Sequence, residues 1–216
     1  MTGTREVKLT DVGLVMTAHA IHLCVLLLPT LVLTGPLAMG RAAIGWEIGC
    51  FALGITAAGV LESLFLTPEV QASDTSIRDK LALRVSLFVG ICLLAVFWSA
   101  QIEWLLHSRR ALAMQAMGGS LLVSGIILRV EAIRALGNQF VSDIRVERLI
   151  VRDGIYAWLR HPSEIGLLLI AIGSSLLLGS IFTAVAAAIL LLPTSLWRMD
   201  RENVALAGRQ RQRSNL

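Results

Sequence analysis

The densest group of chemically useful residues lies between Asp153 and Gly166, where a polar turn leads into an apolar segment. Arg160-His161-Pro162 end the turn, and Pro162 suits the first turn of a helix, where its missing N–H would have no partner anyway. Backbone N–H groups at such a helix start can bind a carboxylate or another anion. Tyr156 adds an aromatic face for a base or a cation. The residues alone predict either a ligand site or an interfacial loop of aromatic and basic membrane anchors.

Several other ionisable residues lie within or at the ends of apolar runs, and they are Glu47, Glu62, Glu103, Glu131, His19 and His22. Acids inside a membrane are costly and often functional, so Glu62, the deepest, is a candidate for a polar pocket or a transport role. Glu131 precedes Arg134 by three residues, which predicts an ion pair on one helix face. The two histidines have no histidine partner on another apolar run, so we expect polar packing and no metal site.

The composition places these residues in a membrane protein. Of the 216 residues, 56% are hydrophobic and 16% are charged, whereas soluble domains average about 45–50% and about 25%. The mean hydropathy is +0.74. This balance excludes a disordered chain, a collagenous chain and a typical cytosolic enzyme. The three cysteines are too few and too scattered for a disulfide framework or a metal centre.

The apolar runs predict an all-α, polytopic membrane bundle, because a spanning helix needs about 20 apolar residues. We expect spans near residues 12–34, 43–66, 81–106 and 111–136. The last apolar block is too long for one span, and Gly179-Ser180 near its middle predicts a tight hairpin of helices at 164–178 and 181–197. This gives six embedded helices, or five if the hairpin is one element.

The basic residues predict the orientation. If the N-terminus is cytoplasmic and there are six passes, the outside holds only Arg41, Arg109 and Arg110. The other sixteen of the nineteen Lys and Arg then lie in or beside cytoplasmic segments, as the positive-inside rule requires. The pI of about 9.5 reflects these loops, and we expect no nucleic-acid partner.

The turn and the segments around it resemble the signature of the isoprenylcysteine carboxyl methyltransferase family, which belongs with the membrane phospholipid methyltransferases. The matching residues are Ile150, Val151, Gly154, Tyr156, Arg160, His161, Pro162, Ser163 and Gly166. Upstream, residues 136–140 resemble the family's approach to this motif. Downstream, Arg198, Glu202 and Leu206 stand where the family closes its hairpin with an arginine, a glutamate and a leucine. The resemblance covers about residues 125–206.

The resemblance implies a cytoplasmic site for S-adenosylmethionine and a lipophilic methyl acceptor. Carried over residue by residue, the cofactor site comprises Arg148, Leu149, Ile150, Val151, Tyr156, His161, Pro162, Ser163, Glu164 and Glu202. Arg198 is the implied catalytic residue, facing the substrate carboxylate and the transferred methyl group. Its guanidinium can hold a carboxylate in a bidentate manner, and Glu202 lies one helical turn further along.

Several positions depart from the family pattern. Glu164 replaces a tyrosine, Arg148 stands where histidine is frequent, Glu202-Asn203 replaces a pair of glutamates, and Ala207-Gly208 begins a basic tail in place of the usual aromatic one. These departures concern the acceptor more than the cofactor. An amine or thiol acceptor would need a base, for which Glu164 is a candidate.

We therefore expect a multi-pass membrane methyltransferase that uses S-adenosylmethionine and whose active site faces the cytoplasm. Residues 1–110 would supply N-terminal spans and residues 111–216 the methyltransferase core, within one domain. The expected acceptor is a carboxylate of isoprenylcysteine type on a lipophilic or prenylated substrate that reaches the site from the membrane lipid. The alternatives are a phospholipid amine or small thiol methyltransferase, and a non-catalytic or transport protein. The sequence does not set the oligomeric state.

Overall fold

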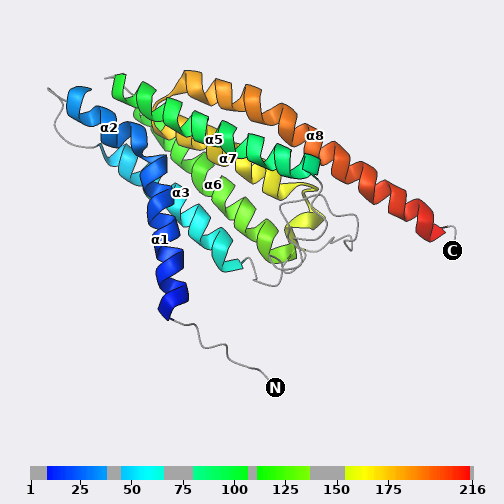
Figure 1. Cartoon of the computed structure of the whole chain (residues 1–216). Helices are drawn as coiled ribbons and strands as arrows, with labels where there is room; N and C mark the ends of the chain where they lie inside the picture. The colour runs from blue at the N-terminus through cyan, green and yellow to red at the C-terminus, as the bar shows by residue number, and fades with distance from the viewer. Residues whose placement is uncertain (1–8, 38–44, 66–79, 107–110, 137–153, 215–216) are drawn as a thin grey trace.

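The structure is a computed structural model that describes residues 9–37, 45–65, 80–106, 111–136 and 154–214. These residues are helical throughout apart from short connections, and no strand occurs among them. The helices are α1 (Leu9–Leu26), α2 (Leu28–Leu37), α3 (Trp46–Phe65), α5 (Lys80–Leu106), α6 (Leu112–Leu136), α7 (Pro162–Leu177) and α8 (Ile181–Ser214), with a short 3₁₀ helix η2 (Gly154–Ala157) before α7. Figure 1 shows them as one elongated bundle.

The fold is the helical membrane bundle that the composition predicts. Within the described residues, three segments are long and apolar enough to cross a membrane: Leu87–Leu106, Leu112–Leu136 and Ile181–Asp200. Thr17–Leu26 and Pro162–Leu177 are shorter apolar helices. Large apolar side chains such as Leu53 and Phe182 are 71% and 78% exposed on the outside of the bundle. A surface this apolar suits lipid tails rather than water.

The first expected span is broken into α1 and α2 around Leu27. Pro29 causes the break, because its ring nitrogen cannot donate to the carbonyl of Val25 one turn earlier. Two side chains of α5 donate hydrogen bonds to carbonyls at the break. The indole N–H of Trp98 donates to the Val25 carbonyl at 3.0 Å, and the Gln101 amide donates to the Leu26 carbonyl at 2.8 Å. The Val25 carbonyl freed by the proline, and the Leu26 carbonyl beside it, thus accept hydrogen bonds from a neighbouring helix.

Helices α6 and α7 pack unusually closely and antiparallel, through two glycines on each. Gly118 and Gly125 on α6 face Gly173 and Gly166 on α7, so both pairs are seven residues apart. A Cβ added at Gly125 would lie 2.7 Å from the Gly166 carbonyl oxygen. The backbones touch because these positions carry no side chain, which is the usual way in which small residues bring membrane helices together.

The expected hairpin is confirmed, with α7 ending at Leu177 and α8 beginning at Ile181. Gly179 has φ +76°, a left-handed conformation that glycine adopts without strain. The N–H of Gly179 donates to the Leu176 carbonyl and that of Ser180 to the Ser175 carbonyl. This pair of bonds is a Schellman motif, which satisfies the last carbonyls of α7 before the chain turns.

Helix α8 is much longer than the expected segment of residues 181–197, which is a correction. It continues through Pro193 to Ser214 and has 34 residues. The residues after Trp197 include many good helix formers and no proline, so backbone propensity extends the helix beyond the apolar block. At 1.5 Å per residue α8 spans about 50 Å, and Figure 1 shows its C-terminal end projecting past the other helices.

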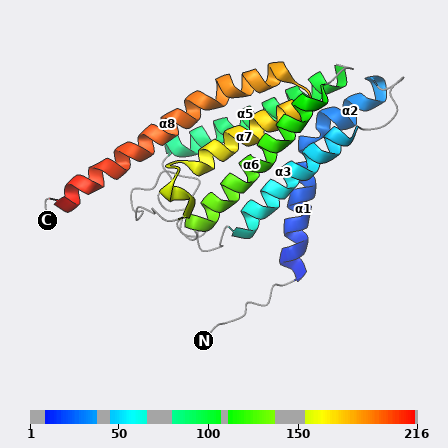
Figure 2. The ribbon, with the colours of Figure 1, turned by 180° about the vertical axis from the view of Figure 1, so that it is seen from behind.

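The bundle brings four helices together at one end. There the last turns of α3 and α6, the first turn of α7 and the middle of α8 are linked by side-chain contacts. Figure 2, from behind, shows the same convergence, with η2 beside the end of α6 and the start of α7. The expected six embedded helices correspond to α1 with α2, and to α3, α5, α6, α7 and α8.

Candidate active site

Helix α7 begins as its sequence predicts, with Pro162 at the first position. His161 is the N-cap residue, with φ −133° and ψ 58°, and its side chain makes no capping hydrogen bond to the helix. Its backbone carbonyl accepts from the Ile165 N–H at 3.2 Å, which closes the first turn. The N–H groups of Ser163 and Glu164 precede that first bond and therefore have no partner within the helix. This helix start is suited to an anionic group.

The residues before α7 form a compact turn against the end of α6. Gly154 has φ +60°, and a Cβ added there would lie 3.9 Å from the Cβ of Ala135 on α6. In the turn that follows, the N–H groups of Trp158 and Leu159 both donate to the Ile155 carbonyl. Tyr156 is half-buried within this turn, whereas Trp158 is 89% exposed. The glycine thus directs the aromatic segment into the same end of the bundle as the start of α7.

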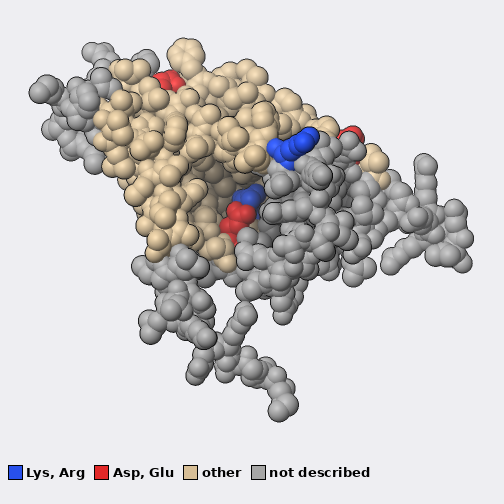
Figure 3. Space-filling model, in the orientation of Figure 1, with Lys and Arg blue, Asp and Glu red and all other residues tan. Residues whose placement is uncertain are grey.

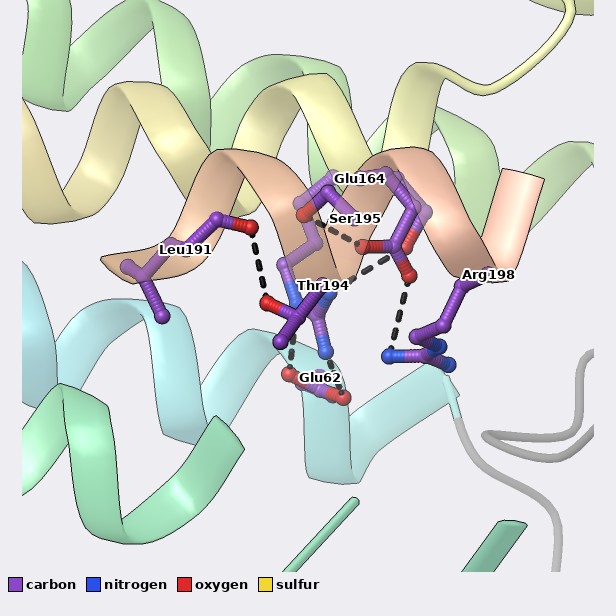
Figure 4. Close-up of polar contacts among 8 residues, drawn as sticks. Glu62, Glu164, Leu191, Thr194, Ser195 and Arg198 are labelled. Atoms are coloured by element: carbon purple, nitrogen blue, oxygen red, sulfur yellow. Dashed lines mark hydrogen bonds and ion pairs between the residues drawn. The ribbon is translucent and has the colours of Figure 1, made fainter. Parts of the chain in front are cut away.

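Glu164 links the two halves of the hairpin, as Figure 4 shows. Its Oε1 lies 3.0 Å from Nη1 of Arg198 on α8, and its Oε2 accepts from the Ser195 hydroxyl at 3.1 Å. Ser195 and Arg198 are three residues apart, so both face α7 from one side of α8. The Glu164 and Arg198 side chains are 13% and 21% exposed. The two sequence motifs, separated by 34 residues, therefore meet in direct contact.

A second charged pair contacts the start of α7 from α6. Arg129 on α6 binds both carboxylate oxygens of Glu62 on α3. Its Nε donates to Oε2 at 2.9 Å, and its Nη2 donates to Oε1 at 2.7 Å. Its third nitrogen, Nη1, donates to the Ser163 hydroxyl at 3.1 Å. A planar fork holds a carboxylate in one orientation. Arg129 therefore fixes Ser163 relative to both α3 and α6.

The structure describes some of the predicted site residues and not others. The structure places Tyr156, His161, Pro162, Ser163, Glu164 and Arg198 at one end of the bundle. Arg148, Leu149, Ile150 and Val151 lie outside the described residues. Glu202 lies on α8, four residues after Arg198, and its side chain is also outside the description. The same face of α8 thus carries both positions.

The sequence reading did not single out Arg129 or Ser195, although both contact predicted site residues. Arg129 had a usable signal, because it is an arginine well inside an apolar run and such charges face the bundle interior. Ser195 had none, since small hydroxyl residues are common in membrane helices. Figure 3 shows acidic and basic side chains together in a hollow of the otherwise largely uncharged described surface.

Other acids contact polar groups outside the set of predicted site residues. Glu47 accepts from the Gln115 amide at 2.9 Å, and Glu103 accepts from the Thr183 hydroxyl at 2.9 Å. Thr183 lies in the first turn of α8, where a negative charge is favourable. The expected pair between Glu131 and Arg134 is confirmed at 3.0 Å and is about half exposed. These contacts connect or stabilise helices.

Comparison with known proteins adds an independent finding. Residues 117–208 match the sequence profile of the isoprenylcysteine carboxyl methyltransferase family. Protein-S-isoprenylcysteine O-methyltransferase B of Arabidopsis thaliana is 27% identical over 128 residues, which is 57% of this chain and 58% of that protein. Protein-S-isoprenylcysteine O-methyltransferase of Schizosaccharomyces pombe is 33% identical over 84 residues, or 37% of this chain and 34% of that protein. The Mus musculus enzyme is 29% identical over 124 residues, or 55% and 39%.

The matches thus cover from about a third to under two thirds of the length of these relatives. No solved structure matches the chain. The matched region includes most of α6, the turn, α7 and most of α8, which are the elements that form the site. Over residues 117–208 the chain is therefore similar to the isoprenylcysteine carboxyl methyltransferase family.

Proposed function

We propose that this protein is a membrane-embedded methyltransferase that transfers a methyl group from S-adenosylmethionine to a lipophilic acceptor, of which a carboxylate of isoprenylcysteine type is the first candidate. The contact between Glu164 and Arg198, at 3.0 Å, carries the proposal. It joins the helix start implied to bind the cofactor to the arginine implied to bind the acceptor. The names of the relatives, which describe action on isoprenylcysteine, support the same acceptor.

The cofactor side of the site would be the turn and the start of α7. The open N–H groups of this start suit the carboxylate of S-adenosylmethionine, and Tyr156 offers a ring to its adenine or its cation. Of the other implied residues, the helix start comprises His161, Pro162, Ser163 and Glu164. Glu202 would contact the cofactor from α8, and residues 148–151 would complete the cofactor site. For Glu164 the backbone N–H is the relevant group, because its carboxylate contacts α8.

The acceptor side would be Arg198. S-adenosylmethionine supplies an electrophilic methyl group on a sulfonium, so the protein has to orient the acceptor and exclude water. A carboxylate is ionised at neutral pH and needs no base. Arg198 would hold it by charge-assisted hydrogen bonds. The polar end of a membrane bundle lets a lipid tail remain in the bilayer while its head reaches this arginine.

A phospholipid amine is the second candidate acceptor, because Glu164 places a carboxylate beside Arg198 and would attract a cationic head group. We further propose that residues 111–216 form the methyltransferase core, that residues 1–110 provide N-terminal spans, and that the site faces the cytoplasm. The basic residues of the sequence support this orientation.

Binding and transfer assays on the full-length protein in lipid nanodiscs test the proposal. Titration with S-adenosylmethionine should show binding, and His161→Ala should weaken it at least several-fold by altering the start of α7. Radiolabelled S-adenosylmethionine should transfer its methyl group to N-acetyl-S-farnesylcysteine as a base-labile ester. The matched control is Glu131→Gln, in an ion pair that is about half exposed and contains none of the predicted site residues. Absence of cofactor binding would favour a non-catalytic protein, and an unchanged dissociation constant for His161→Ala would remove the turn from the site.

A further inference from the structure

Glu164 and Arg198 form a pair in which the protein's own carboxylate contacts the implied substrate-binding arginine. Each oxygen of Glu164 has a partner on α8, since Oε1 contacts Arg198 and Oε2 accepts from Ser195. Both charged side chains are largely shielded, at 13% and 21% exposure. Figure 4 shows the carboxylate between the hydroxyl and the guanidinium.

We propose that Glu164 is an internal competitor for Arg198 and a specificity-determining residue, which a carboxylate acceptor has to displace before it binds. The inference rests on the proposed function, because it takes Arg198 as the acceptor-binding residue. According to this inference, the charge of the acceptor's head group affects its affinity for the site. Acceptors with a free carboxylate bind more weakly than the arginine alone would allow, whereas neutral acceptors with the same lipid tail are little affected.

The local structure explains why Glu164 holds this position. It lies in the first turn of α7, where the helix dipole favours a negative side chain. The Schellman turn at Gly179 fixes α7 against α8, so Ser195 and Arg198 stay opposite Glu164. A carboxylate acceptor brings a second negative charge to the same guanidinium. Displacing Glu164 costs its contact with Arg198, and two carboxylates at one shielded site repel each other.

Equilibrium binding of two probes tests the inference on full-length protein in nanodiscs. The probes are N-acetyl-S-farnesylcysteine, which carries the carboxylate, and its methyl ester, which does not. S-adenosylhomocysteine is present so that no transfer occurs. Glu164→Gln keeps the size of the side chain and removes its charge, so it should lower the Kd of the acid about tenfold, as expected for loss of a competing charge-assisted hydrogen bond. The Kd of the ester should change less than about twofold.

A second test variant keeps the inference falsifiable if Glu164→Gln folds poorly, and a further variant serves as the control. Ser195→Ala retains both charges and removes only the hydroxyl that holds Oε2, so it should lower the Kd of the acid by about two- to fivefold. Glu131→Gln removes a carboxylate from an equivalent but exposed Glu–Arg pair and should change neither probe.

The outcomes separate the inference from the proposed function. Selective tightening of the acid in Glu164→Gln and Ser195→Ala supports the inference. An unchanged or weaker affinity for the acid in both variants overturns it, as does equal tightening of acid and ester. Methyl transfer by the wild-type protein is measured separately, without S-adenosylhomocysteine. If transfer is present and the affinity ratio does not move, the inference fails while the function stands.

Discussion

Among the described helices, acidic side chains inside the bundle pair with a different helix rather than with each other. The contacts join Glu47 to Gln115, Glu62 to Arg129, Glu103 to Thr183 and Glu164 to Arg198. A charge that is shielded from water needs such a partner, because solvation by the surroundings is otherwise lost. An intramembrane acid therefore does not by itself mark chemistry. Among these four acids, only Glu164 is itself a residue of the helix start that is implied to bind the cofactor.

The first prediction at this scale concerns Arg129. Arg129→Ala leaves Glu62 without its bidentate partner at 25% exposure, and it also removes a donor to Ser163. Loss of a buried partner costs about 3–5 kcal/mol, and partial exposure reduces this to about 2–3 kcal/mol. Thermal unfolding should show a clear drop in apparent Tm. Arg134→Ala, in a pair whose side chains are 56% and 48% exposed, is the control and should cost under about 1 kcal/mol. Equal effects of the two variants would contradict this account.

The second prediction concerns Arg198. Arg198→Lys keeps the positive charge beside Glu164 but loses the planar fork, which is not a conservative change at a bidentate site. Affinity for S-adenosylmethionine should stay within about twofold, while kcat falls about 10²-fold because the acceptor is mispositioned. Glu202→Gln should show the reverse pattern, with weaker cofactor binding as its main defect. Turnover of Arg198→Lys at the wild-type rate would show that this arginine does not orient the acceptor.

At the scale of elements, close helix packing depends on glycines seven residues apart rather than four. Gly45-x-x-x-Gly49 has the familiar spacing for helix contact, and we would expect packing there from the sequence. In the structure Gly45 lies before α3, and a Cβ added at Gly49 meets no atom of the described residues within 4 Å. The interface lies instead between α6 and α7, where Gly125 meets Gly166 and Gly118 meets Gly173.

The third prediction uses this contrast. Gly125→Ala introduces a methyl group 2.7 Å from the Gly166 carbonyl oxygen and 2.8 Å from the Ile170 nitrogen. Both are backbone atoms, so the helices have to separate, and overpacking of this kind costs about 1–3 kcal/mol. The apparent Tm should fall, and the turn that carries Tyr156 should shift with α6. Gly49→Ala is the matched control and should leave the apparent Tm unchanged or slightly higher. A similar loss in both variants would refute the proposed tight interface.

The limits of sequence reading follow from which interactions are local. The hairpin was predictable because Gly179-Ser180 interrupts an apolar block, and the start of α7 because Pro162 marks it. The break near Leu27 was not, although Pro29 is a local signal, because an apolar run alone does not show whether neighbours such as Trp98 and Gln101 can satisfy freed carbonyls. Arg198 and Glu164 were identified separately. Their contact depends on how α7 packs against α8, which spacing along the chain does not encode.

At the scale of the whole molecule, the two largely shielded Glu–Arg ion pairs of the described residues lie at one end of an apolar bundle. The convergence of α3, α6, α7 and α8 there, by contacts such as Arg129 to Glu62 and Arg198 to Glu164, leaves a lipid-like surface along the sides. A transporter would be expected to carry polar side chains along a path through the bundle. This arrangement instead favours a surface reaction, in which a lipid tail stays in the bilayer and its head group reaches the polar end.

The fourth prediction tests which side of the membrane this end faces. In a variant with Cys24, Cys50 and Cys92 replaced by alanine, single cysteines are introduced by Ser108→Cys and Ser214→Cys. Ser214 ends α8, beyond the polar end, whereas α5 ends with Leu106 at the opposite end of the bundle, and Ser108 lies outside the described residues. From the distribution of basic residues along the sequence, the positive-inside rule predicts that the polar end faces the cytoplasm. A membrane-impermeant maleimide added to intact cells should label residue 108, and it should label residue 214 only after permeabilisation.

Labelling of both positions from one side would contradict the six-pass topology, and the reversed pattern would place the polar end outside. That second outcome would deprive the proposed site of cytoplasmic S-adenosylmethionine, so this experiment also bears on whether the site can work in the cell.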